Sequence, residues 1–112
     1  MDSIGRNIQI LLSVIKRSEE YLEYKKQEAE LKKNPELLAR VDQFRADNFR
    51  LQNEANRENL IQVTDQIYQE SRELRKIPQV NAYLDAELAM CRMMQRISRA
   101  VIEGIDMHIP DI

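Results

Sequence analysis

Apolar residues recur along the first third of the chain at the spacing of an amphipathic α-helix. Between Ser3 and Lys33 they are separated by steps of three, four and seven residues, which places them on one helical face. They are Ile4, Ile8, Leu11, Ile15, Leu22 and Ala29. Asp2 or Ser3 is expected to cap this helix, because a short polar side chain there accepts a free backbone N–H. The pattern predicts one long helix over residues 3–33.

Two prolines divide the rest of the chain. Pro35 ends the first helix and begins a second, because the residue before a proline avoids helical backbone while proline suits the first helical position. Asn34 is expected to cap that second helix. Pro78 makes a second break of the same kind. The pattern then predicts a last helix over 79–103 that stops at Gly104, and a frayed tail over 105–112.

A weaker joint lies between the prolines. Residues 53–59 contain three asparagines and no strong apolar residue, which predicts a turn near 56–59, with helices over 35–55 and 60–76 on either side. One continuous helix over 35–77 is the alternative. The fold class is therefore all-α, a single domain over 1–112, built as an antiparallel bundle of four helices, or three if the second and third are continuous.

The composition favours an all-helical fold and predicts that a partner chain covers part of the surface. The 112 residues include only two Gly and three Pro, so the chain lacks the turn residues that a sheet requires. Trp is absent and Phe occurs twice, so the core must come mainly from aliphatic residues. Because long thin helices have a large surface for their volume, we expect a partner chain to cover part of the apolar surface.

The surroundings of the two prolines repeat. Glu30-Leu31-Lys32-Lys33-Asn34-Pro35 matches Glu73-Leu74-Arg75-Lys76-Ile77-Pro78 at an offset of 43 residues. One interpretation is a duplicated helical hairpin. The other is that any two helix–proline–helix corners look alike.

Charge and cysteine content indicate a soluble, cytoplasmic protein. The net charge is -2 with acidic and basic residues interleaved, which is typical of a solvated helical surface and not of a nucleic-acid stripe. Cys91 is the only cysteine, which suggests a reducing compartment. No apolar run approaches the roughly 20 residues that span a bilayer. The apolar run 8–15 is followed at once by charged residues, unlike a signal peptide. We expect no membrane partner.

Candidate chemistry is sparse. His108, the only histidine, lies in the predicted tail, and Cys91 lies on an apolar stripe where a buried thiol is the usual state, with a reactive or ligand role as the alternative. The chain has neither paired Cys or His at metal-ligand spacing nor a glycine-rich phosphate loop. The sequence predicts no enzyme activity, no cofactor and no metal.

The last helix carries the best candidates for binding. Its predicted apolar stripe consists of Val80, Leu84, Leu88, Cys91, Met94, Ile97 and Val101. The methionines beside Cys91 either fill the core with one left exposed, or form an adaptable contact surface, for which methionine is well suited. The predicted dimer or partner interface is Met90, Met93, Met94 and Ile97. Arg92, Arg96 and Arg99 form a row that is either an ordinary charged face or a contact for RNA phosphates.

Two segments resemble the YlbF/YmcA family of small bacterial helical proteins. The first is the acidic–aromatic run over residues 18–25, followed by Asn34-Pro35-Glu36 and by Phe44 in the next helix. The second is Pro78-Gln79-Val80-Asn81-Ala82-Tyr83-Leu84-Asp85-Ala86-Glu87. The resemblance spans about residues 4–105, although the central turn lacks the glycine often found in relatives.

The resemblance implies a non-enzymatic regulatory protein of all-α fold that forms a homodimer or a hetero-oligomer with related helical proteins. Members are linked to competence, sporulation and biofilm formation, and some join a partner called YaaT in a complex that acts on ribonuclease Y and messenger RNA processing. Such complexes are also associated with iron–sulfur clusters. The resemblance thus favours an adaptor that binds protein, with direct RNA binding through the arginine row as the alternative.

Overall fold

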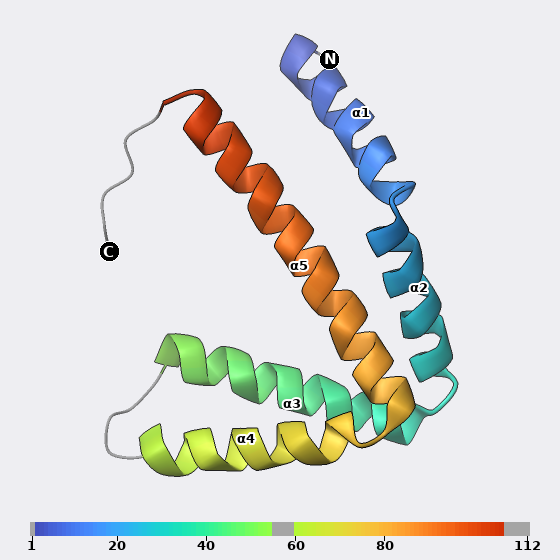
Figure 1. The fold of residues 1–112 in the computed structure, drawn as a ribbon, viewed down its shortest axis with the longest axis vertical. Helices are drawn as coiled ribbons and strands as arrows, with labels where there is room; N and C mark the ends of the chain where they lie inside the picture. Colours follow the sequence, from blue (N-terminus) through green and yellow to red (C-terminus); the bar gives the residue numbers. More distant parts are fainter. Residues whose placement is uncertain (1, 55–59, 107–112) are drawn as a thin grey trace. The chain divides into compact units, whose positions relative to one another are not determined.

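The computed structural model describes residues 2–54 and 60–106, and every regular element in these ranges is a helix. The helices are α1 (Ser3–Lys16), α2 (Glu19–Lys32), α3 (Pro35–Glu54), α4 (Leu60–Arg75) and α5 (Pro78–Gly104) (Figure 1). The all-α class is confirmed, but the expectation of four or three helices is wrong, since the described ranges hold five. The turn predicted near 56–59 lies outside the described residues, as do residues 107–112 of the predicted tail, which include His108.

The predicted first helix over 3–33 is broken at Ser18. The backbone N–H groups of Arg17 and Ser18 donate to the carbonyls of Val14 and Ile15, which closes α1 with a tightened turn. The Ser18 hydroxyl accepts a hydrogen bond from the Tyr21 N–H at 3.2 Å, and so caps α2. Two glutamates in the first turn of α2 then stabilise the helix, because their negative charges lie at the positive end of its dipole. A serine followed by two acidic residues was the available sequence signal for this break.

The predicted N-terminal caps at Asp2 and Asn34 are confirmed. The Asp2 carboxylate accepts from the Gly5 N–H at 2.6 Å at the start of α1. The Asn34 side chain accepts from the Leu37 N–H at 3.2 Å, which leaves Pro35 at the first position of α3. At the far end of α5, the helix continues to Gly104, and the left-handed residue after it is Asp106, with φ of 54°.

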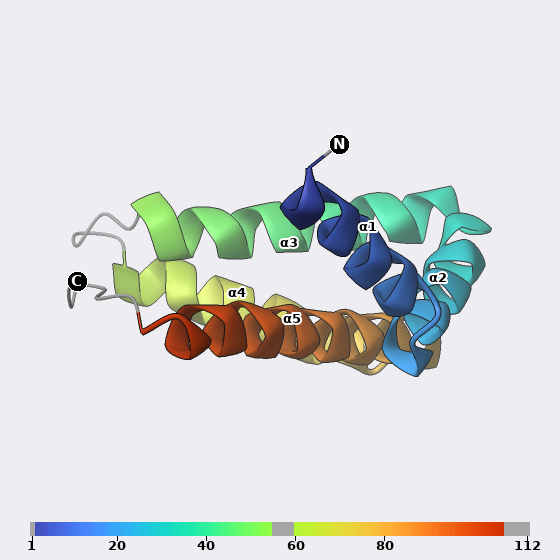
Figure 2. The same ribbon diagram turned by 90° about the horizontal axis from the view of Figure 1, so that it is seen from above.

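Helices α3 and α4 pack side by side as a hairpin, which Figures 1 and 2 show from two directions. Arg40 on α3 reaches Glu70 on α4, with its Nε 2.7 Å from a carboxylate oxygen. Two helices in lateral contact cannot be one continuous rod, so the alternative of a single helix over 35–77 is wrong. A bundle of all the helices stays a prediction.

The helices form two compact units. Unit 1 contains the described residues of 2–24 and 85–106, and unit 2 contains those of 25–84. Among the described residues, the largest fully buried side chains all lie in unit 2: Leu31, Val41, Leu74 and Val80. Most of the aliphatic core therefore lies in the α3–α4 hairpin and the helix ends that adjoin it.

The two proline corners of unit 2 have the same local geometry. At the first, the N–H groups of Lys33 and Asn34 donate to carbonyls three residues back, and the Lys33 ammonium lies 3.0 Å from the Glu30 carboxylate. At the second, Lys76 and Ile77 make the equivalent backbone bonds. The Lys76 ammonium there lies 2.9 Å from the Glu73 carboxylate. The sequence repeat is thus a repeat of structure, which both interpretations of its origin allow.

Candidate interaction surface on α1 and α5

The apolar stripe of α5 is buried at its start, and most of its later members are exposed. Val80 and Leu84, the first two members, are buried. The exposed members are Leu88, Cys91, Met94 and Val101. The expectation that Cys91 is a buried thiol is wrong, because the stripe continues past the core of the chain. Between Leu88 and Val101 the stripe presents apolar side chains to solvent.

The four residues predicted as an interface differ in exposure. Met94 leaves 47% of its surface exposed, whereas Met93 leaves only 7% and belongs to the chain's own core. Met90 and Ile97 are half-buried. Met93 therefore has little surface to offer a partner, and Leu88, which was not in the predicted set, is 43% exposed.

Helix α1 is also strongly amphipathic with an uncovered apolar face. Ile15 is its only buried residue. Its exposed large apolar residues are Ile4, Ile8, Ile10, Leu11, Leu12 and Val14. Single exposed apolar residues are common on protein surfaces, whereas several gathered on one helix typically mark a binding surface. The sequence predicted an apolar face on this helix that includes Ile4, Ile8 and Leu11.

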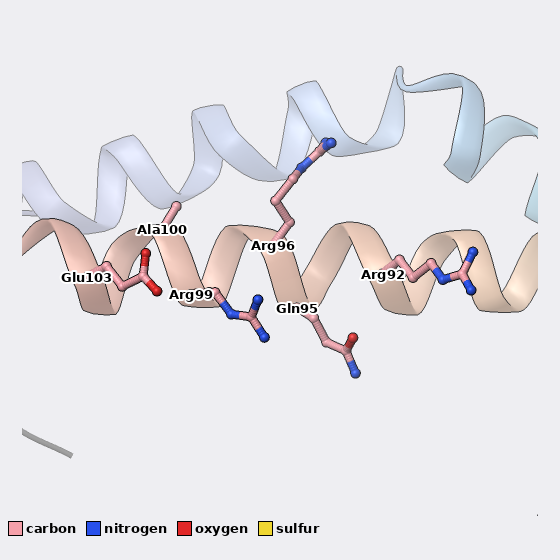
Figure 3. Close-up of a pocket in the computed structure, with 6 residues that line it drawn as sticks. All are labelled: Arg92, Gln95, Arg96, Arg99, Ala100 and Glu103. Carbon is pink, nitrogen blue, oxygen red and sulfur yellow. The ribbon is translucent and has the colours of Figure 1, made fainter.

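The arginine row of α5 begins next to Leu88 and runs along the side of the helix away from Met94 and Val101. A shallow hollow of about 300 Å³ is lined by residues of α5 alone. These are Arg92, Gln95, Arg96, Arg99, Ala100 and Glu103 (Figure 3). In this view Arg96 and Gln95 project to opposite sides of the helix, while Arg92 and Arg99 extend along it. The three arginines of the predicted row are thus neighbours on one exposed surface.

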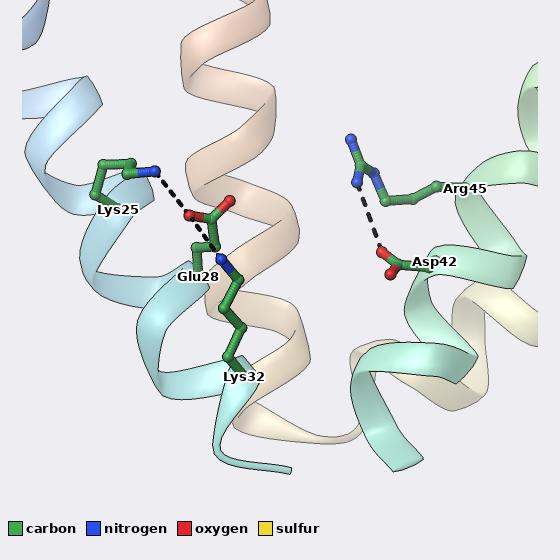
Figure 4. Close-up of polar contacts among 5 residues, drawn as sticks. All are labelled: Lys25, Glu28, Lys32, Asp42 and Arg45. Carbon is green, nitrogen blue, oxygen red and sulfur yellow. Dashed lines mark hydrogen bonds and ion pairs between the residues drawn. The ribbon is translucent and has the colours of Figure 1, made fainter. Parts of the chain in front are cut away.

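The cations of unit 1 differ from those of unit 2. Among the described residues of unit 2, most cations form ion pairs, for example Arg45 with Asp42 at 3.8 Å and Lys25 with Glu28 at 2.8 Å (Figure 4). The Lys32 ammonium also lies 3.7 Å from the Glu28 carboxylate. No ion pair within the described ranges involves any cation of unit 1. These cations are Arg6, Lys16, Arg17, Arg92, Arg96 and Arg99.

Two pKa shifts accompany the ion pairs of unit 2. A hydrogen bond from Lys76, and then its charge, lower the pKa of the Glu73 carboxylate. The hydrogen bond to Glu70 raises the pKa of the Arg40 guanidinium. Both groups are at the surface, so these shifts describe local pairing and not a buried reactive centre.

Binding of a metal ion or a cluster needs several ligating side chains close together. No cluster there combines three or more His, Cys, Asp or Glu side chains that could hold a metal ion. Iron–sulfur clusters use several cysteine thiolates, whereas this chain has one cysteine, so its own residues do not fit such a cluster. Within the same ranges, no helix is both long enough and apolar enough to cross a bilayer.

The fold and surface define a small all-helical protein with uncovered apolar helix faces. The sequence profile described as "Control of competence regulator ComK, YlbF/YmcA" matches residues 4–106. The chain therefore belongs to the YlbF/YmcA family, which is linked to the control of the competence regulator ComK. The resemblance found in the sequence is thereby confirmed. Searches of curated proteins and of solved structures found no significant match.

Proposed function

We propose that this chain is a non-enzymatic, cytoplasmic adaptor that regulates by binding other proteins through the apolar surface of unit 1. The observation that carries the proposal is the exposed stripe of α5, where Leu88, Met94 and Val101 are each more than two-fifths exposed. Covering such side chains gains roughly 25 cal/mol for each Å² removed from water. The apolar face of α1 supports the same conclusion.

The family supports a regulatory role. By the resemblance described above, that role extends to competence, sporulation and biofilm formation, and to ribonuclease Y-dependent messenger RNA processing. The partner is a second copy of the chain or a related helical protein. Within the predicted interface, Met94, Met90 and Ile97 remain candidates for contact, because each retains some exposed surface.

The proposal is tested by light scattering of the purified chain, alone and mixed with a related helical member of the family. We expect a mass above the 13.3 kDa of one chain in at least one of these samples. The double variant Leu88→Glu/Met94→Glu should weaken the assembly by about a hundredfold, because a charge at each position must be desolvated on association.

Ile61→Glu is the matched control. Ile61 is a highly exposed apolar residue on α4 in unit 2, so its replacement should leave the assembly unchanged. A wild-type chain that stays monomeric in both samples at micromolar concentration would overturn the proposal.

Direct RNA binding is the second candidate, and the hollow lined by Arg92, Arg96 and Arg99 favours it. If RNA phosphates occupy this row, the affinity for single-stranded RNA must fall as salt rises, because binding releases counterions. A titration at two salt concentrations separates the candidates. If no salt-dependent binding is observed, direct RNA binding through the arginine row is wrong.

A further inference from the structure

Helix α1 carries positive charge without negative charge. Residues 3–17 contain three cations and no carboxylate, although the chain has 19 Asp and Glu in total. The cations are Arg6, Lys16 and Arg17. None of them forms an ion pair with a described residue. The nearest carboxylates along the chain belong to Asp2, which caps the helix, and to Glu19, which is already on α2. The charge of α1 is therefore not compensated within the helix.

The apolar residues of α1 cover a wide arc of the helix. Ile10, Leu11 and Leu12 follow one another at about 100° each, so together they span roughly 200°. The other large apolar residues fall within the same arc: Ile4, Ile8, Val14 and Ile15. The polar residues within it are Ser3 and Asn7. Every apolar member except Ile15 leaves at least 39% of its surface exposed. A helix that packs on one neighbour needs a stripe of only about 100°, so this arc is wider than one partner helix covers.

Cations stand at both borders of this arc. Arg6 precedes Ile10 by four residues and Arg17 follows it by seven, so both lie within about 40° of that end of the arc. Lys16 follows Leu12 by four residues and lies about 40° beyond the other end. The polar side between the two borders holds uncharged residues, which are Gly5, Gln9 and Ser13. A surface that accepts the whole arc therefore meets positive charge along both edges of the helix.

From this geometry we infer that α1 lies in the interface of a membrane that contains anionic phospholipids. The apolar arc enters the boundary between headgroups and acyl chains, which takes in half of a helix at once. The cations, just beyond the two borders, then lie at the level of the lipid phosphates, and their long side chains reach them. The expectation of no membrane partner rested on the length needed to span a bilayer, which an interfacial helix does not require. The inference goes beyond the proposed function, whose carrying observation is the stripe of α5.

A partner helix and RNA fit α1 less well. An acidic helix packed on the arc would meet the cations of one border only, because the arc itself separates the two borders. RNA phosphates would pair with the cations but leave the exposed apolar residues in water. Residues 3–17 also contain no aromatic side chain on which a base could stack.

The test measures binding of the full chain to lipid vesicles by co-sedimentation. The vesicles consist of phosphatidylcholine alone or of phosphatidylcholine mixed with phosphatidylglycerol. We expect binding to the mixed vesicles to be at least about tenfold tighter at low salt, because each lysine or arginine near an anionic surface is attracted to it. That preference should shrink as salt rises, because salt screens the attraction.

A change in the apolar arc connects this binding to α1. Ile4→Gln/Ile10→Gln removes two highly exposed apolar side chains and should weaken binding to the mixed vesicles by at least about tenfold. Leu88→Gln/Met94→Gln is the matched control, because it makes the same kind of change at exposed positions of α5 and should leave vesicle binding unchanged. Glutamine is a good helix former, and circular dichroism verifies that each variant folds.

A change in the borders tests the role of charge. Arg6→Gln/Lys16→Gln removes one cation from each border and should abolish most of the preference for phosphatidylglycerol. Arg50→Gln/Arg72→Gln removes the same charge from exposed positions of unit 2 and should preserve that preference. Equal effects of the two variants would show that the net charge of the chain, and not α1, sets the binding.

Equal binding to both kinds of vesicle, or equal losses from the α1 and α5 variants, would overturn the inference. So would a lack of vesicle binding, including the case in which Ile4 and Ile10 are instead required for assembly with a protein or Arg6 and Lys16 for binding of single-stranded RNA. If vesicles do not bind while light scattering still shows an assembly, the inference is wrong and the adaptor function stands. Vesicle binding by a chain that stays monomeric would support the inference and contradict the adaptor function.

Discussion

At the scale of single residues, Ser18 determines where one helix ends and the next begins. Its hydroxyl accepts from the Tyr21 N–H and donates to the Ile15 carbonyl at 2.6 Å. It therefore gives the Ile15 carbonyl a second donor beside the Ser18 N–H, and supplies an acceptor for a free N–H at the start of α2. Hydrophobic periodicity alone passes through this position without interruption, because it records faces and not hydrogen bonds.

Replacing Ser18 with alanine should lower the free energy of unfolding by about 1 kcal/mol, since the Tyr21 N–H loses its acceptor. Urea denaturation followed by circular dichroism measures the change. Ser13→Ala is the control, because Ser13 is exposed within α1, where alanine is the better helix former. Equal stability of the two variants would contradict the role assigned to the Ser18 hydroxyl.

At the scale of helices, the two proline corners each place one leucine in the core. Leu31 and Leu74 occupy equivalent positions of the repeat, and each is 0% exposed. The charged residues on either side of these leucines stay at the surface, where Glu30 pairs with Lys33 and Glu73 with Lys76. The corner thus combines a buried anchor, a surface ion pair and a proline that starts the next helix.

Leu31→Ala and Leu74→Ala should each lower the free energy of unfolding by about 2–5 kcal/mol, because each removes buried methyl groups and leaves a cavity. Leu22→Ala provides the comparison, since Leu22 is exposed on α2. Equilibrium denaturation of the three variants under the same conditions tests this. Similar losses at all three positions would show that the corner leucines are no more important than a surface leucine.

Local rules predicted most of the helix boundaries correctly. Pro35, Pro78, Asp2 and Asn34 act within four residues along the chain, so their effects can be read without knowing the fold. The exposure of Cys91 and Leu88 could not be read in this way. Periodicity places both on an apolar face, but whether the chain itself covers that face depends on tertiary packing. The same holds for the arginine row, whose lack of ion pairs with other described residues depends on which carboxylates lie nearby.

At the scale of the whole molecule, the two units differ in what stabilises them. Unit 2 contains the fully buried aliphatic side chains and the α3–α4 hairpin. In unit 1, α1 buries only Ile15 and exposes most of its other large apolar residues. Because local stability follows the burial of apolar contacts, α1 belongs to the part of the chain that opens most readily.

Hydrogen exchange measured residue by residue should show this difference. We expect amides in the middle of α1 to exchange at least about tenfold faster than those around Val41 and Leu74 in the hairpin. Addition of a partner that covers unit 1 should slow exchange in α1 and α5. Uniform protection of both units in the free chain would contradict this view.

The exposed thiol of Cys91 gives the molecule a built-in reporter position. Because the chain has a single cysteine, a maleimide dye attaches at one site without any mutation. That site lies within the stripe between Leu88 and Met94, so its dye would respond to whatever covers the stripe. The same accessibility means that air oxidation can join two chains through a Cys91–Cys91 disulfide. Measurements of reversible association therefore require a reductant.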